Sequence, residues 1–300
     1  MFDLLKKILI SVSWRVPRKH FQNKILNSLG LQLILTFSGN LFFRIRHVLK
    51  SLYVINIYDD RTLKAVNDLN EKGITIINDF LDLEDFYEIK NSFKSILQND
   101  SNNKEIIRVG NIRKEQFSLN NKMIDANKNS LNKYENNTLK KLINNKTIKE
   151  ILSYADARFL MDETSISLNK IYKTENKGED SEAKFHQDHF FPVFKVWLLI
   201  NDSKEERAAL KYIPSSHKLN FSRILFIYKK SIFSRGGSWS IDEKTLNNIY
   251  ESAPISINEK QNTLVIANTF GFHARGVFKS NYDSTDRIMI SHRMNPFIPF

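Results

Sequence analysis

The spacing of apolar residues differs between the two halves of the chain. In the first half, apolar residues recur every three or four positions, the period of an α-helix. This pattern predicts two or three helices within residues 1–55 and further helices over 59–73 and 82–97, with a β-branched strand at 74–80. Gly39 is expected to interrupt the first group of helices.

The second half of the chain consists of short apolar runs separated by loops. The runs are "RFLMDE", "SISLNKIYK", "VFKVWLLIN", "ALKYIP", "PISI", "TLVIANT" and "RIMISHRM". Because no helix alternates regularly with them, they predict an antiparallel β-barrel or jelly roll, and the whole chain an α+β fold. Residues 98–147 are rich in Asn, Lys and Ser and show few clear periods, so we expect a loop-rich segment, long loops around short helices, that covers a site as a lid.

Charge changes the picture at the N-terminal end. Residues 1–50 hold nine Lys or Arg against a single Asp, which is most of the chain's net charge of +12. We therefore separate a basic helical extension, residues 1–56, from a main domain, residues 57–300, which contains the predicted jelly roll. Such a basic patch can meet an anionic membrane, nucleic acid or an acidic partner, and a solvated basic face is the plainer alternative.

Two further features bear on location. The chain has no cysteine, which excludes disulfides, thiolate metal sites and thiol nucleophiles and suits the cytoplasm. The most apolar stretch, residues 29–43, is interrupted by polar residues and is shorter than the roughly 20 apolar residues of a membrane span. We expect a cytoplasmic protein, with peripheral contact between residues 1–50 and an anionic membrane as an open alternative.

Candidate chemistry lies at the entrance to one apolar strand, in "KFHQDHFF". Side chains alternate along a strand, so His186 and Asp188 point to the same side. Taken alone, this triplet also fits a surface turn. Among seven histidines, His273 is the best third ligand, because it follows an apolar strand and Gly271 allows a close approach of the backbone. Two His and one carboxylate on a β-scaffold are typical of non-haem Fe(II) oxygenases.

A second requirement concerns the co-substrate. If such an iron uses 2-oxoglutarate, the far carboxylate needs a buried cation, for which the arginine fork is best suited. Arg287 and Ser291 share one face of the strand "DRIMISHRM", and we assign both to co-substrate binding. Trp197, on the strand after the metal motif, is a further cofactor-binding candidate, although ordinary core packing explains it equally well.

These residues carry a resemblance. "FHQD", "VWLLIND", "ALKYIPSSHK", "TLVIANTFGFHARG" and "RIMISHRMNPF" occur in the order seen in bacterial proteins similar to phytanoyl-CoA dioxygenase. The resemblance covers roughly residues 60–300. It implies a double-stranded β-helix core with flanking helices. It further implies Fe(II) held by His186, Asp188 and His273, 2-oxoglutarate gripped by Arg287, and O₂ as oxidant.

The same resemblance bears on the reaction. Related halogenases replace the carboxylate of the triad by a small residue, and Asp188 is intact, which favours hydroxylation. Two positions depart from the family pattern. "PSSHK" replaces the usual "PGSHK" in a turn, and Arg275 stands where some members have a co-substrate-binding Ser or Thr.

Three functions are weighed. The first is an Fe(II)- and 2-oxoglutarate-dependent dioxygenase that hydroxylates a small or lipid-linked metabolite. The second is an oxidative nucleic-acid demethylase, suggested by the six-residue offset of Arg287 and Arg293; no aromatic base-stacking platform is evident, so no nucleic-acid partner is expected. The third is a non-catalytic, membrane-associated binding protein on an oxygenase fold, which would have no need of an intact triad.

Overall fold

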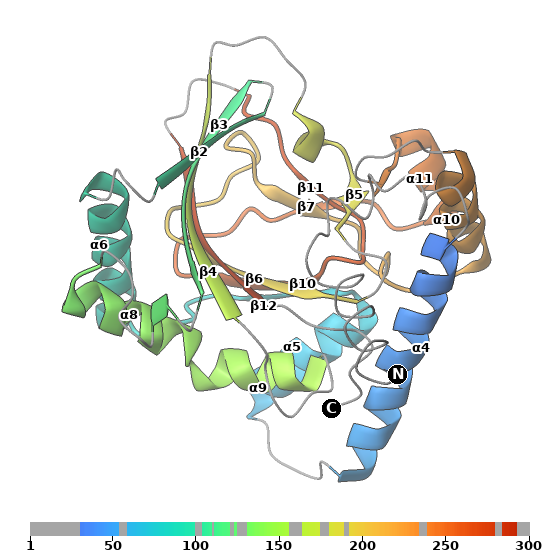
Figure 1. The fold of residues 1–300 in the computed structure, drawn as a ribbon, viewed down its shortest axis with the longest axis horizontal. Coiled ribbons are helices and arrows are strands. Elements are labelled where there is room, and N and C mark those ends of the chain that lie inside the picture. Colours follow the sequence, from blue (N-terminus) through green and yellow to red (C-terminus); the bar gives the residue numbers. More distant parts are fainter. Residues whose placement is uncertain are drawn as a thin grey trace, which may run out of the picture.

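The structure is a computed structural model. It describes residues 31–53, 59–99, 104–109, 111–120, 123–124, 131–155, 164–174, 180–188, 192–233, 239–279 and 284–292. Two antiparallel β-sheets face each other at its centre, and helices flank them (Figure 1). This is the jelly roll that the strand pattern predicts.

The larger sheet has seven strands. In spatial order they are β1 (Ile74–Ile77), β10 (Leu264–Asn268), β6 (Phe194–Leu199), β12 (Thr285–His292), β4 (Thr164–Lys173), β3 (Ile112–Asn120) and β2 (Lys104–Val109). The smaller sheet has five strands, in the order β8 (Trp239–Ser240), β5 (His186–Gln187), β11 (His273–Arg275), β7 (Leu210–Tyr212) and β9 (Ile255–Ser256).

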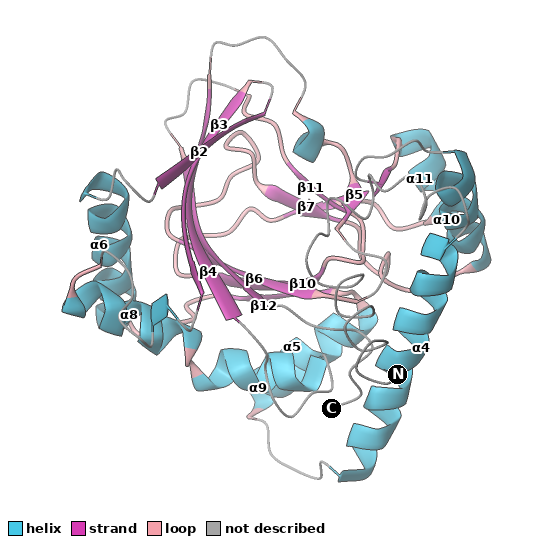
Figure 2. Cartoon of the chain, viewed as in Figure 1, coloured by secondary structure: helices cyan, strands magenta, loops and turns pink. Residues whose placement is uncertain are grey.

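Helices cover the outer face of the larger sheet and one end of the smaller sheet (Figure 2). The described helices are α4 (Leu31–Tyr53), α5 (Asp60–Glu71), α6 (Leu83–Asn99), α8 (Lys133–Ile143), α9 (Lys146–Ala155), α10 (Phe221–Phe233), α11 (Glu243–Ile249) and the short 3-10 helix η1 (Ser181–Ala183). Within these residues, no helix is long and apolar enough to cross a membrane.

Side-chain alternation gives the larger sheet an apolar outer face, and an inner face that carries polar residues on β12 beside the apolar cluster of β1, β10 and β6. On β12, Ile288 and Ile290 are buried in the main apolar cluster, together with residues of α5, α6, α8 and α9. Arg287, Met289 and Ser291 point the other way, toward the smaller sheet. The predicted division of this strand is confirmed, and it makes the inner face available to a polar ligand.

The helix–strand–helix prediction that precedes the barrel is also confirmed. Asp59 caps α5, since its side chain accepts a hydrogen bond from the Thr62 backbone N–H at 2.7 Å. Gly73 ends the helix with φ +80, a conformation that glycine adopts without strain. The strand is β1, at one edge of the larger sheet, and α6 follows it.

The first helical region differs from the expectation at Gly39. Helix α4 runs through this residue without a break, because Gly39 is buried where the helix contacts the rest of the protein. Phe43 packs against the main apolar cluster, and His47 Nε2 lies 2.9 Å from Ala155 O. Residues 1–30 and 54–58 lie outside the described residues, so the domain division at residue 56 stays a prediction.

Residues 98–147 are the second difference. The expectation of long loops is wrong for residues 104–109 and 112–120, which form strands β2 and β3, whereas α8 agrees with the expected short helices. Strand β3 pairs with β4 along nine positions and so belongs to the larger sheet. Its strand period is obscured in the sequence because polar residues stand on both faces and pair across strands, as Lys104 does with Glu115 at 3.3 Å. A role for this segment as a lid stays a prediction.

Candidate metal and co-substrate site

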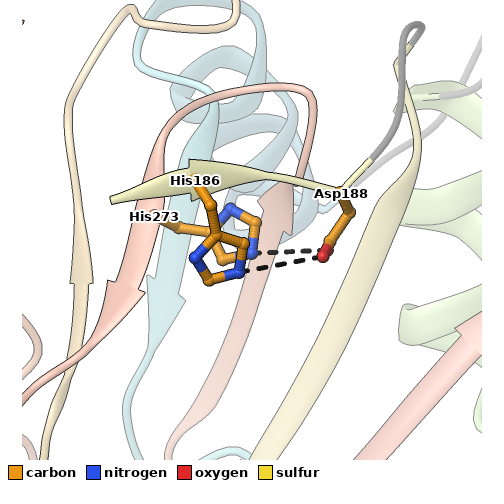
Figure 3. A group of neighbouring side chains, drawn as sticks. All are labelled: His186, Asp188 and His273. Carbon is orange, nitrogen blue, oxygen red and sulfur yellow. Dashed lines mark ion pairs between the residues drawn. The ribbon is translucent and has the colours of Figure 1, made fainter. Parts of the chain in front are cut away.

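Two neighbouring strands of the smaller sheet bring three potential metal ligands together. His186 on β5 lies directly opposite His273 on β11, and Asp188 follows β5. Asp188 Oδ2 is 3.3 Å from His273 Nε2, and Asp188 Oδ1 is 3.9 Å from His186 Nε2 (Figure 3). In the part of the chain that the structure describes, these are the only three His, Asp or Glu side chains whose ligand atoms lie within 4.8 Å of one another.

Backbone carbonyls fix the orientation of both imidazoles. His186 Nδ1 lies 2.8 Å from Lys184 O, and His273 Nδ1 lies 3.1 Å from Gly271 O. A carbonyl only accepts hydrogen bonds, so each Nδ1 must carry the proton. Burial, and then the neighbouring His273, lower the pKa of His186 and keep that ring neutral. The lone pairs on Nε2 therefore point toward Asp188, the arrangement that metal-binding histidines adopt.

Asp188 is ionised and incompletely satisfied. Burial opposes its ionisation, but Lys195 and His273 outweigh this effect and hold the pKa of Asp188 well below its ordinary value. Lys195 Nζ lies 2.7 Å from Asp188 Oδ2, yet this buried oxygen accepts no well-aligned hydrogen bond from the described residues. An incompletely satisfied carboxylate oxygen beside two imidazole lone pairs fits a divalent transition metal.

Gly271 fits the close approach predicted for it. A β-carbon at this position would overlap the hydroxyl of Tyr212 and lie 2.7 Å from Tyr212 Cζ. The same hydroxyl donates to Asn268 O at 3.0 Å, and the Gly271 N–H donates to Asn268 O at 2.9 Å. The turn that leads into His273 is thus built around the ring of Tyr212.

Arg287 lies on the inner face of the larger sheet, between Leu199 of β6 and Asn169 of β4. It lines a small, mostly apolar cavity together with Trp197. Burial, and then repulsion from Arg275, lower the pKa of Arg287 to about 10. Glu182 attracts the guanidinium, but among the described residues no carboxylate forms an ion pair with it, so it faces the interior without a contacting anion.

Asn169 strengthens this inner-face position. Its side chain is almost wholly buried, and its Oδ1 has no hydrogen-bond partner among the described residues. Since Asn169 is the direct neighbour of Arg287 across the β4–β12 ladder, the two side chains present a polar wall to the interior. Buried polar groups rarely lack partners, which points to a ligand at this wall.

Trp197 and Ser291 are the other two residues predicted to bind the co-substrate. Trp197 borders the cavity beside Arg287 and also belongs to an apolar cluster, so its position fits both co-substrate binding and core packing. Ser291 lies opposite Lys195, and its hydroxyl is 3.0 Å from Ser165 Oγ. Their binding of a co-substrate stays a prediction. His189 and Arg293 lie outside the described residues.

Arg275 is held by acidic neighbours. Its guanidinium donates to both carboxylate oxygens of Asp180, Nε at 3.1 Å and Nη2 at 2.6 Å, and its Nη1 lies 3.8 Å from Glu182 Oε2. Arg275, which stands where some members of the resembling family have a co-substrate-binding Ser or Thr, is thus occupied by acidic side chains. This pairing also leaves Arg287 as the unpaired arginine of this region of the described chain.

Two lysines have roles that the sequence reasoning did not predict; Lys195 was considered only as a substrate contact or a rim residue. Lys195 faces Asp188, as described above. Lys114 on β3 is the other: burial, and then repulsion from Arg287, lower the pKa of Lys114 to about 8. It lies opposite Ile171 of β4, which is itself opposite Thr285 of β12, so it is on the same face as Arg287. Alternation along "IRKEQFSLN" could have revealed this face had the strand been recognised.

Comparisons with known proteins agree with this geometry. The family model of phytanoyl-CoA dioxygenase matches residues 69–246, more than half of the chain. No protein of curated function matches the sequence. Among solved structures, an iron-bound EctD from S. alaskensis has a TM-score of 0.51 at 10% identity and covers 79% of each chain.

Two further solved structures have the same fold. AviO1 from Streptomyces viridochromogenes has a TM-score of 0.50 at 12% identity, over 80% of this chain and 97% of that one. The epimerase SnoN, solved with Fe³⁺, α-ketoglutarate and a nogalamycin compound, has a TM-score of 0.50 at 13% identity, over 77% and 83%. The predicted family and double-stranded β-helix fold are confirmed.

Proposed function

Because the chain belongs to the phytanoyl-CoA dioxygenase family, we propose that it is an Fe(II)- and 2-oxoglutarate-dependent dioxygenase. The observation that carries the proposal is that a set of metal ligands and an arginine without an ion pair lie between the same two sheets. His186, Asp188 and His273 present three ligand atoms without a cation, and Arg287 presents a buried cation without an anion. Iron and a keto-dicarboxylate together supply both.

The triad would hold Fe(II) from one side. Its two imidazole nitrogens and one carboxylate oxygen leave positions open for a co-substrate and O₂. When bound, the iron couples oxidative decarboxylation of 2-oxoglutarate, by O₂, to succinate and CO₂ with insertion of one oxygen atom into a substrate C–H bond. SnoN and EctD, which share the fold, were solved with iron, and SnoN also with α-ketoglutarate.

Arg287 would bind the far carboxylate of 2-oxoglutarate. The guanidinium fork meets a carboxylate bidentately, and it remains charged even with its pKa lowered to about 10. Lys114 adds a second positive charge to the same region, and Asn169 can accept or donate a further hydrogen bond. The chain's contribution is thus to orient the co-substrate and to bind it against the inner face of the larger sheet, away from water.

We propose hydroxylation of a small or lipid-linked metabolite as the reaction. Asp188 occupies the carboxylate position, which leaves no vacant ligand site for a halide and disfavours halogenation. The epimerase name of SnoN shows that this fold also serves other outcomes, so the product must be identified directly. The demethylase alternative gains no support, since Met289 lies between Arg287 and Ser291 on the inner face and Arg293 is outside the described residues.

Helix α4 supports the proposed peripheral contact with a membrane. Between residues 36 and 48 its exposed positions are Phe37, Leu41, Arg44, Ile45 and Val48, so its outward face is apolar and basic. These positions recur every three or four residues on the face opposite the buried one. The helix contains no Asp or Glu.

Helix α10, which contacts α4, repeats the pattern. Phe221, Leu225 and Tyr228 are exposed along one face, Lys229 is exposed beside them, and this helix also lacks Asp and Glu. Apolar side chains with nearby cations and no acid fit the interface of an anionic bilayer. An enzyme held there would reach lipid-linked substrates.

The oxygenase proposal is tested with the ion and co-substrate alone. Under anaerobic conditions, Fe(II) and 2-oxoglutarate together should raise the melting temperature of the wild-type protein. His186→Ala should abolish the rise. His217→Ala is the control, because His217 bonds to the backbone at Asn70 O and not to the triad. Equal responses from the wild type and His186→Ala would reject the proposal. If the response is lost in His186→Ala alone, succinate release in air is the assay that identifies substrates.

A further inference from the structure

Gln187, the residue between two of the proposed ligands, points away from the site. Alternation places it on the opposite side of β5 from His186 and Asp188, and its side chain is fully buried. Its Oε1 accepts a hydrogen bond of 2.8 Å from Arg223 Nη2. A buried amide in this position therefore links the ligand strand to helix α10.

Arg223 is a fully buried arginine. Besides Gln187, it donates to Phe270 O and Ser216 O and, at 2.9 Å, to Tyr250 Oη. Its guanidinium carbon lies 4.2 Å from the ring centre of Phe270 and 4.4 Å from that of Phe272. Among the described residues no carboxylate forms an ion pair with it. Carbonyl oxygens and aromatic faces stabilise this charge instead.

The two ends of this contact network are the two ligand-bearing segments. Gln187 belongs to the segment of His186 and Asp188, whereas Phe270 lies three residues before His273. The β5–β11 ladder itself has a single pair of facing residues, His186 and His273, and the Asp188 N–H donates to Thr269 O at 3.0 Å, so few backbone contacts join the two segments. Arg223 bonds to both segments from one rigid guanidinium fork.

We propose that Arg223 is a positioning residue, which holds the segments of His186–Asp188 and of His273 at the separation that lets them share one ion. This inference rests on the proposed function, since it assigns the ion to the same triad. Burying an arginine without a carboxylate is costly, and an apolar residue would pack this site with less cost to stability. A guanidinium at this buried position is explained if its Nη2 atom, which donates to Gln187 Oε1 and to Phe270 O, serves the site.

A matched pair of variants separates positioning from simple packing. Gln187→Leu and Tyr250→Phe each remove one hydrogen bond to the same guanidinium, but only Gln187 lies on a ligand segment. Both should lower the melting temperature of the metal-free protein. Gln187→Leu should weaken Co(II) binding about 10- to 100-fold, the range for partners that orient metal ligands. Tyr250→Phe should leave Co(II) affinity within about twofold. It keeps the aromatic ring and removes only a hydroxyl, whose partners Arg223 and Ser216 O are not on a ligand segment.

The conservative variant Gln187→Glu completes the test. It keeps an acceptor for Arg223 and adds a charge pair, so Co(II) affinity should return to within about threefold of the wild type. Equal losses of Co(II) affinity in Gln187→Leu and Tyr250→Phe, or no loss in Gln187→Leu, would overturn the inference.

A structural measurement distinguishes failure of this inference from failure of the proposed function. If the wild type binds no Co(II), the proposed function fails, and crystal structures of the metal-free variants decide the positioning role. The ring centres of His186 and His273, 4.6 Å apart in the wild type, should separate in Gln187→Leu and stay in place in Tyr250→Phe. Unchanged separation in both variants would refute it.

Discussion

Lys195 Nζ lies 2.7 Å from Asp188 Oδ2, the same carboxylate oxygen that is 3.3 Å from His273 Nε2. The lysine thus forms an ion pair with the residue through which the triad would bind its ion. Lys195 keeps Asp188 ionised against the effect of burial, and its ammonium would also repel a divalent cation at this site. The stability of the metal-free protein and its affinity for metal are therefore opposed at Lys195.

Lys195→Met should consequently destabilise the metal-free protein and strengthen metal binding. The pKa of Asp188 is lowered in the folded state, so its contribution to stability is present above the unfolded value of 3.8 and is lost as pH falls through the folded value. The loss in the variant should be about 1–3 kcal/mol near pH 7, since Lys195 is partly exposed, and should begin to shrink as pH falls below 3.8. Thermal unfolding from pH 3 to 7, with and without Co(II), measures both effects. A variant with wild-type stability and a smaller Co(II)-induced rise would contradict this prediction.

Arg287→Met should weaken co-substrate binding strongly and yet raise stability. Truncation of one member of a buried charge pair costs about 2–5 kcal/mol of binding, so calorimetry should show 2-oxoglutarate affinity reduced by that amount in the Co(II)-loaded protein. Without ligands, the variant should melt at a higher temperature, because a buried guanidinium without an ion pair is replaced by an apolar side chain. Co(II) binding should be unchanged. If 2-oxoglutarate binds the variant as well as it binds the wild type, Arg287 has another role.

Lys114 should make 2-oxoglutarate binding sensitive to alkaline pH. With its pKa lowered to about 8, Lys114 loses its charge as pH rises through that value, and the attraction to a dicarboxylate is lost with it. The dissociation constant should therefore increase between about pH 7.5 and 9. Lys114→Arg, which stays charged, should remove this dependence. Identical pH profiles for the two proteins would show that Lys114 does not contact the co-substrate.

The contrast between Arg287 and Lys114 shows how much could be predicted from the sequence. Arg287 lies in a strand whose other face carries Ile288 and Ile290 at its centre, so alternation alone predicted its inward direction. Lys114 lies in "IRKEQFSLN", where both faces are polar, and only the long-range pairing of β3 with β4 reveals which face is buried. Arg223 was missed for a related reason. Its helical segment shows an ordinary amphipathic period, and nothing local indicates that an arginine on it reaches two distant ligand segments.

Gly271→Ala should damage the site through Tyr212. A β-carbon would overlap the Tyr212 hydroxyl, and overpacking of this kind costs about 1–3 kcal/mol of stability. Because the turn leads into His273, Co(II) affinity should fall as well. Tyr212→Phe removes the overlapping oxygen at the cost of one hydrogen bond, so the double variant should be more stable than Gly271→Ala alone. Denaturant unfolding of the four proteins in this cycle measures the coupling, and strictly additive effects would exclude the proposed overlap.

Leu41→Glu on helix α4 should weaken binding to anionic vesicles about tenfold or more. The change removes an apolar contact worth up to about 1.5–3 kcal/mol when fully buried in lipid and adds a charge that anionic headgroups repel. Leu63→Glu on α5 is the matched control. Leu63 is also exposed, at 47% against 58% for Leu41, but it belongs to neither α4 nor α10. Co-sedimentation with vesicles containing phosphatidylserine should weaken with salt in the wild type, because screening shortens the reach of the basic residues. Equal binding of wild type and Leu41→Glu, or wild-type binding that is the same on neutral vesicles, would place the membrane contact elsewhere or remove it.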